Sequence, residues 1–152
     1  DANGAYLTEE LRKIAGIKVP RPDYVTRHGY HLFVYTYESA GFKSLPLAKF
    51  LEAMRAEGIS CGSGYSPLYR DGVFQNPIAR LPLTRALDYY SKLHLPVVEE
   101  LSTTTVWMYQ SMMLGSRQDM EDIISAQVKK YQKTKRSEWF KNETNLQPAA
   151  PV

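Results

Sequence analysis

The sequence predicts an α/β (α+β) fold in which helices cover at least one face of a small sheet of about three strands. Segments with helical periodicity alternate along the chain with segments rich in aromatic and β-branched residues. Helices or long loops separate the strand-like segments, so hairpin topology is not expected. The 152 residues, 43% of them hydrophobic, are enough to bury a core without disulfides or metals.

The first two elements have clear patterns. Leu7, Leu11 and Ile14 are spaced as one face of a helix, and Gly16 can end it. This helix begins at the first residue with no capping residue before it, so we expect it to be part of a longer helix. Residues 30–37 read Tyr-His-Leu-Phe-Val-Tyr-Thr-Tyr and are the clearest strand. Both alternating sets of this strand are largely apolar, which predicts that both of its faces are covered.

A second helix is predicted between Ser44, which can cap it, and Gly58, which can end it. Residues 59–61 resemble a short strand that enters a long segment, residues 62–82, punctuated by glycine and proline. Long loops in compact domains tend to carry function. The apolar stripe of the second helix is Leu47, Phe50, Leu51 and Met54.

The remaining elements alternate again. Residues 83–90 repeat a helical stripe, a short helix follows Pro96, and residues 103–108 form a strand pattern. Ser116 and Asp119 have the spacing of a capping box that opens a last helix. We expect residues 1–136 to form the domain and residues 137–152 to be a polar, flexible tail. The stripe of the last helix is Met120, Ile123, Ile124, Val128 and Tyr131.

Composition excludes several classes of protein. With 19 Lys+Arg against 16 Asp+Glu, the net charge of +3 is too small to indicate nucleic acid as the partner. Weak binding through the basic stretch 129–141 stays a minor alternative. The sequence has no apolar stretch long enough to span a membrane, so no membrane partner is expected. The single Cys61 excludes an internal disulfide and suits a cytoplasmic location.

Motifs for metal or phosphate chemistry are weak. His28 and His31 would lie on opposite faces of a strand, so no metal site is expected. A polar ring at position 31 of an apolar strand must find a hydrogen-bond partner or face a cavity. Gly62-Ser63-Gly64 lacks the rest of a phosphate-binding loop, and its glycines more simply allow a tight bend or close backbone approach.

Other candidate groups have both ordinary and functional interpretations. Adjacent carboxylates such as Glu99 and Glu100 are interpreted as solvated helix surface or first-turn charge. Cys61 is interpreted as a half-buried structural thiol rather than a nucleophile. Tyr65, Tyr69 and Arg70 lie on a loop shaped by glycine and proline, and such groups line sugar or phosphate sites. Packing of the tyrosines against the loop is an equally good interpretation.

Six segments occur in an order and spacing that resemble the C-terminal part of the DegT/DnrJ/EryC1/StrS family of pyridoxal-phosphate-dependent sugar aminotransferases. The resemblance covers about residues 1–131. The segments are Asn3–Leu11 (NGAYLTEEL), His28–Phe33 (HGYHLF), Phe50–Ile59 (FLEAMRAEGI), Gly64–Tyr69 (GYSPLY), Leu95–Glu100 (LPVVEE) and Val106–Gln110 (VWMYQ) continuing to Leu114-Gly115.

The resemblance implies the small C-terminal domain of a fold-type-I aminotransferase. Such enzymes are usually homodimers and move an amino group from glutamate or glutamine to a keto sugar. Family members carry the cofactor lysine and most phosphate ligands in a large domain that is missing from this sequence. We therefore expect pyridoxal phosphate in the full-length enzyme, and neither cofactor nor catalytic residues on this chain alone.

The resemblance also implies that the loop after the second helix approaches the active site. In many relatives this loop reads His-Tyr-x-Pro-Leu-His. Here Gly64 and Tyr69 replace the two histidines, while Tyr65, Pro67 and Leu68 match. We predict that Tyr65 and Tyr69 contact the sugar, with His31 as a third contact.

Two main hypotheses follow. In the first, the chain is a C-terminal domain or fragment of such an enzyme and needs the large domain as its partner. In the second, it is a stand-alone, non-catalytic binding module for a sugar nucleotide or a partner protein. If the large domain is missing, apolar surface that packed against it should be exposed, which predicts self-association or a marginal fold.

Overall fold

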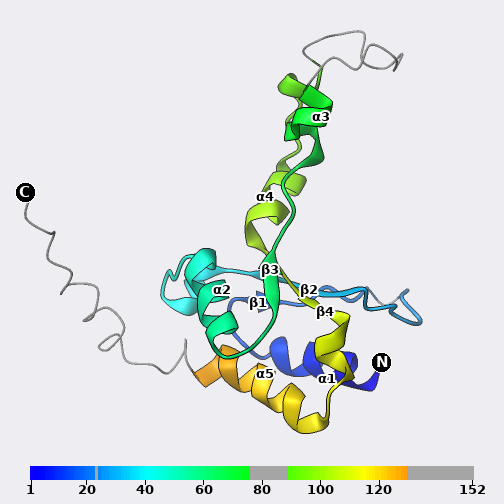
Figure 1. Cartoon of the computed structure of the whole chain (residues 1–152), viewed down its shortest axis with the longest axis vertical. Helices are drawn as coiled ribbons and strands as arrows, with labels where there is room; N and C mark the ends of the chain where they lie inside the picture. Colours follow the sequence, from blue (N-terminus) through cyan, green and yellow to red (C-terminus); the bar gives the residue numbers. More distant parts are fainter. Residues whose placement is uncertain (23, 76–88, 130–152) are drawn as a thin grey trace, which may run out of the picture.

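The computed structural model describes residues 1–22, 24–75 and 89–129. A four-stranded antiparallel sheet has the order β1-β2-β4-β3, and helices pack on one of its faces (Figure 1). The strands are β1 (Ile17–Lys18), β2 (Leu32–Tyr37), β3 (Cys61–Ser63) and β4 (Thr105–Tyr109). The helices are α1 (Ala2–Leu11), α2 (Leu47–Ala56), α3 (Gly72–Gln75), α4 (Pro96–Thr104) and α5 (Arg117–Lys129). Short 3-10 turns are η1 (Ser39–Phe42), η2 (Leu68–Arg70), η4 (Tyr90–Lys92) and η5 (Gln110–Leu114).

The sheet confirms the small α+β architecture and adds one strand to the three expected. Strand β1 has only two residues, paired with the end of β2 so that Ile17 lies opposite Tyr37. Two residues are too few to show an alternating pattern, so no local pattern predicts this strand. Strand β4 begins two residues later than expected because Thr103 and Thr104 complete α4. Their hydroxyls donate to the Glu100 carbonyl oxygen at 2.9 Å.

The core lies between the sheet and helices α1, α2 and α5. Phe33, Tyr35 and Tyr37 of β2 face it and are almost completely buried, as are Val106 and Met108 of β4. Aromatic rings connect the sheet to α2, since the Tyr37 ring lies 4.5 Å from that of Phe50 between centroids. The predicted stripes of the first, second and last helices contribute to this core through Leu7, Leu11, Ile14, Phe50, Leu51, Met54, Met120 and Ile123.

The opposite face of the sheet, which we call the open face, is only partly covered. It carries Leu32, Val34 and Thr36 of β2 and Trp107 and Tyr109 of β4. Val34 is 38% exposed and Tyr109 is 49% exposed. The expectation that both faces of β2 are covered is therefore wrong for the described residues. An apolar pattern indicates that a face is buried, but it does not show whether the residues that bury it belong to the same chain.

The helix ends agree only in part with the sequence signals. Ser116 donates to Asp119 Oδ2 through its backbone N–H at 2.6 Å and its hydroxyl at 2.7 Å, which confirms the capping box of α5. Ser44 is not the cap of α2, because this helix begins after Pro46 and Ser44 has a φ of +61°. Gly58, at a φ of +83°, follows the end of α2 as expected.

Between β3 and β4 the chain leaves the sheet and returns, and Figure 1 shows this excursion extending away from the rest of the molecule. We call its described residues, 64–75 and 89–104, the arm. Most of the predicted helix 83–90, and the whole of the predicted tail 137–152, lie outside the described residues. In the described part of the chain, no helix is long and apolar enough to cross a membrane.

Candidate functional site

The arm leaves the sheet through two glycines that allow close packing. A Cβ at Gly62 would collide with the Trp107 ring, and one at Gly64 would lie 2.6 Å from the Leu101 carbonyl oxygen. The Trp107 indole N–H also donates to the Ser63 carbonyl oxygen at 2.6 Å. These contacts confirm the interpretation of both glycines as points of close approach. They also show that a side chain at position 64 would meet the backbone of α4.

Three aromatic side chains form what we call the aromatic patch: Tyr65, Trp107 and Tyr109. Tyr65 stacks on Trp107 with 6.4 Å between ring centroids and 14° between planes. Tyr109 meets Trp107 edge to face at 4.9 Å. Trp107 and Tyr109 belong to the open face, and Tyr65 is 71% exposed. The patch therefore offers aromatic surface and a tyrosine hydroxyl to a ligand or a neighbouring domain.

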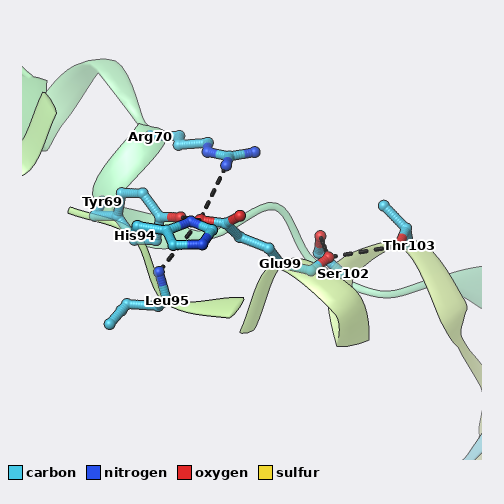
Figure 2. Close-up of polar contacts among 7 residues, drawn as sticks. All are labelled: Tyr69, Arg70, His94, Leu95, Glu99, Ser102 and Thr103. Atoms are coloured by element: carbon cyan, nitrogen blue, oxygen red, sulfur yellow. Dashed lines mark hydrogen bonds and ion pairs between the residues drawn. The ribbon is translucent and has the colours of Figure 1, made fainter. Parts of the chain in front are cut away.

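A second group, the Glu99 cluster, lies in the arm, where η2 meets the start of α4 (Figure 2). Glu99 Oε1 accepts a hydrogen bond from the Tyr69 hydroxyl, and it lies 3.1 Å from both the Arg70 guanidinium and His94 Nδ1. The backbone N–H of Leu95 also donates to it, at 3.2 Å. One carboxylate thereby joins η2 to the first turn of α4.

Hydrogen bonding determines the protonation of the Glu99 cluster. The Tyr69 hydroxyl, followed by the Leu95 N–H and His94, lowers the pKa of Glu99 to about 2 against a smaller opposing effect of burial. Burial, together with the hydrogen bond to Glu99, raises the pKa of Tyr69. At neutral pH the cluster therefore contains an ionised Glu99 and a protonated Tyr69, which favours the observed donor and acceptor roles.

The structure places the three predicted site residues in different environments. Tyr65 is exposed on the aromatic patch, whereas Tyr69 is buried and its proton is directed to Glu99. His31 precedes β2 and is exposed, and it makes no hydrogen bond, ion pair or ring contact within the described parts of the chain. The expectation that a ring at position 31 of an apolar strand finds a hydrogen-bond partner or faces a cavity is wrong, because β2 begins at Leu32 and His31 is exposed to solvent.

Two residues of this region were not singled out from the sequence. Trp107 was expected on a strand, but its role depends on Gly62, which lies directly opposite it across the β3–β4 pair. Glu99 was interpreted as surface or first-turn charge, and its first-turn position is correct. A Tyr-Arg pair 30 residues earlier in the sequence was the available signal for the cluster, but spacing along the chain does not predict such a contact.

The remaining chemical candidates have structural roles. Cys61 is buried, and burial raises the pKa of its thiol, as expected of a structural cysteine. His28 accepts a hydrogen bond from the Tyr30 N–H at 2.9 Å. No group of three or more metal-ligating side chains occurs among residues 1–22, 24–75 and 89–129.

The described residues do not fit a pyridoxal phosphate site. The cofactor requires a lysine that faces an enclosed pocket. The lysines whose side-chain environment is described are all exposed, and Lys13 and Lys18 form surface ion pairs with Glu10 and Glu38. The other three are Lys43, Lys49 and Lys92.

The small antiparallel sheet, with helices on one face and a long excursion before its last strand, agrees with the fold that the resemblance to the small domain of a fold-type-I aminotransferase predicted. The fold is similar to that of 3-amino-5-hydroxybenzoic acid (AHBA) synthase, with a TM-score of 0.62 and 15% identity over 83% of this chain and 32% of the synthase chain. Residues 1–132 match the DegT/DnrJ/EryC1/StrS aminotransferase family, and the chain belongs to this family.

Relatives in Streptoalloteichus tenebrarius and Micromonospora echinospora carry more specific names. A protein of Streptoalloteichus tenebrarius assigned as an L-glutamine:3-amino-2,3-dideoxy-scyllo-inosose aminotransferase is 30% identical over 84% of this chain. A protein of Micromonospora echinospora with the same assignment is 30% identical over 81% of it. The L-glutamine:2-deoxy-scyllo-inosose aminotransferase of Streptoalloteichus tenebrarius is 26% identical over 68%. The aligned region represents 33%, 31% and 26% of these three relatives, so the chain spans about a third of their length or less.

Proposed function

We propose that this chain is the C-terminal domain, or a fragment, of a pyridoxal-phosphate-dependent aminotransferase that moves an amino group from glutamine or glutamate to a keto sugar or cyclitol. Family membership and the fold support the reaction class. The names of the relatives support a cyclitol ketone as acceptor and glutamine as donor. The partners in this proposal are the large cofactor-binding domain and a second copy of the full enzyme.

The proposal includes no catalysis by the chain alone. Transamination needs a lysine to hold the cofactor and move protons at the reacting carbon. The five lysines whose side-chain environment is described are exposed, which supports a cofactor lysine outside these five. The buried free thiol of Cys61 is compatible with the cytoplasmic location that we propose.

The single observation that carries the site proposal is the exposed aromatic patch beside a loop fixed by Glu99. In this proposal Tyr65 packs against the substrate ring and hydrogen-bonds to one of its hydroxyls. Tyr69 is a second contact through the remaining lone pair of its hydroxyl oxygen. His31, exposed before β2, would be a third contact only if the substrate reaches that end of the open face.

A chimeric enzyme tests this function. Residues 1–132 would replace the matching part of the L-glutamine:2-deoxy-scyllo-inosose aminotransferase of Streptoalloteichus tenebrarius, and amino transfer from glutamine to 2-deoxy-scyllo-inosose would be measured with pyridoxal phosphate present. We expect activity in the chimera, lower activity in its Tyr65→Ala variant and none in the 152-residue chain alone. Turnover by the chain alone, or an unaffected Tyr65→Ala variant of an active chimera, would contradict the proposal.

A stand-alone binding module is the second candidate, and the 71% exposure of Tyr65 favours it as well. Calorimetric titration of the chain with UDP-glucose distinguishes the binding module from the enzyme domain. Saturable binding supports the module, whereas its absence supports the domain. The nucleic-acid alternative rests on residues 129–141, which lie almost wholly outside the described part of the chain.

A further inference from the structure

The Glu99 cluster connects two parts of the arm that are far apart in sequence. Tyr69 and Glu99 are 30 residues apart, and Figure 2 shows Tyr69, Arg70 and His94 directed at one carboxylate. The Glu99 side chain is 20% exposed, while those of Arg70 and His94 are 57% and 75% exposed. The carboxylate therefore lies between the buried Tyr69 on one side and the exposed Arg70 and His94 on the other.

Helix capping explains only part of this arrangement. Glu99 lies in the first turn of α4, where a carboxylate is favourable, and it accepts from the Leu95 N–H at the helix start. This capping role does not require Tyr69 or Arg70, which belong to η2 on the outgoing part of the arm. Two side chains from a separate segment indicate a second role for the same carboxylate.

Tyr65 is the residue that this second role affects. It lies four residues before Tyr69, between the close approach of Gly64 to α4 and the buried Pro67 and Tyr69. Gly64 fixes one end of the segment through its N–H, which donates to the Thr105 carbonyl oxygen at 2.9 Å. Glu99 fixes the other end through Tyr69. Both ends of the segment are therefore held, and the exposed Tyr65 ring between them stacks on Trp107.

We propose that Glu99 is a positioning residue that holds residues 64–70 against α4 and so keeps Tyr65 stacked on Trp107, ready to receive the substrate. This proposal rests on the proposed function only for the identity of the ligand. The positioning itself is a property of the free chain. A loop held in place in advance binds more tightly, because the apparent dissociation constant rises as the fraction of molecules in the competent arrangement falls.

Trp107 can report this positioning without any ligand. The chain contains two tryptophans, so a Trp139→Phe background leaves Trp107 as the single fluorescent indole. We would measure its quenching by acrylamide, with Tyr65→Ala as the reference for a lost stack. We expect Glu99→Gln and Tyr69→Phe to increase the quenching of Trp107 toward the value of Tyr65→Ala. The double variant should show no more quenching than either single variant, because the effects of two residues that act through one contact do not add. Far-UV circular dichroism confirms that α4 and the sheet are retained.

Glu100→Gln is the matched control, since Glu100 is the next residue of α4 and is exposed. We expect its quenching to equal that of the parent chain. Unchanged protection in Glu99→Gln, or an equal loss in Glu100→Gln, would overturn the proposal. A loss in Glu99→Gln with none in Tyr69→Phe would also overturn it, since that pattern indicates helix capping alone.

Ligand binding is measured separately with 2-deoxy-scyllo-inosose on the chimera. If Tyr65 is in place in about a tenth of Glu99→Gln molecules, the apparent dissociation constant rises about tenfold. The Glu100→Gln value should change by less than about twofold, as for other surface substitutions. Failure of the chimera to bind this ketone would count against the proposed function. This failure would not affect the positioning role, because the quenching experiment measures it without a ligand.

Discussion

Gly64 lies where the arm passes the backbone of α4. A Cβ at this position would meet the carbonyl oxygens of Leu101 and Ser102 at 2.6 and 2.9 Å, so the backbone must shift to admit it. We expect Gly64→Ala to lower the free energy of unfolding by about 1–3 kcal/mol, as for other overpacked sites. Urea titration checks this, with Gly29→Ala as control because no atom lies within 4 Å of its added Cβ. Equal stability of the two variants would contradict the predicted close contact.

Cys61 permits a second test at the level of one residue. Burial raises the pKa of its thiol, so at neutral pH it is protonated and shielded from reagents. We expect an aromatic disulfide reagent to react slowly with the folded chain and rapidly in urea. Because the sequence contains one cysteine, the absorbance change reports this thiol alone. Equal rates with and without urea would show that the thiol is not protected by the fold.

Single residues also show what the sequence could predict about the site. Tyr65 was identified correctly as a loop residue, and Gly62 and Gly64 as points of close approach, whereas the exposure of Tyr65 was left open. Trp107 and Glu99 were missed because their roles depend on contacts with residues 44 and 30 positions away. Local patterns carry no information about such contacts. The substrate contacts of Tyr65, Tyr69 and His31 stay predictions.

Among the elements, α5 has the most complete local signal. Ser116 lies directly before the helix and Asp119 in its first turn, and each side chain satisfies the other's backbone N–H. We expect Ser116→Ala to lower the free energy of unfolding by about 1 kcal/mol, as for other lost helix caps. Thermal unfolding followed by circular dichroism checks this, with Ser116→Thr as the conservative control. A Ser116→Ala variant as stable as the parent would mean that the cap adds nothing to α5.

The pH dependence of this cap has a defined sign. The hydroxyl and N–H of Ser116 lower the pKa of Asp119, so the folded state favours the ionised carboxylate. The stabilisation is therefore complete above the ordinary pKa of an aspartate and is lost as the pH falls through the lowered value. Ser116→Ala should flatten this part of the stability profile.

Elements with amphipathic patterns were predicted well, and those defined by long-range pairing were not. Helices α1, α2 and α5 were found because each buries a stripe at helical spacing. Strand β1 was missed because two residues pair with β2 only after the chain has turned back. The start of α2 was misplaced because Ser44, a good capping residue, adopts a positive φ instead. Propensity ranks the possible caps, but the surrounding turn selects among them.

At the scale of the whole molecule, apolar exposure is concentrated in the arm and on the open face. No residue of α4 is buried, and Val97, Val98 and Leu101 are 66%, 41% and 44% exposed. A surface of this kind is typical of an interface, which agrees with a chain that spans about a third of its relatives. Further exposed apolar or aromatic side chains of these regions are Val34, Tyr65, Leu68, Val73, Phe74, Tyr89, Leu95 and Tyr109.

We therefore expect the isolated chain to self-associate through the arm. Val97→Asp should weaken this association, because it places a charge on the exposed side of α4 while favouring the helix start electrostatically. Ala48→Asp is the matched control, since it adds the same charge to an exposed position in the first turn of α2. Sedimentation equilibrium should show a mass above 17.4 kDa for the parent and Ala48→Asp chains, and a shift toward that mass for Val97→Asp. A parent chain that sediments as a stable monomer at high concentration would show that the arm does not require a partner to cover it.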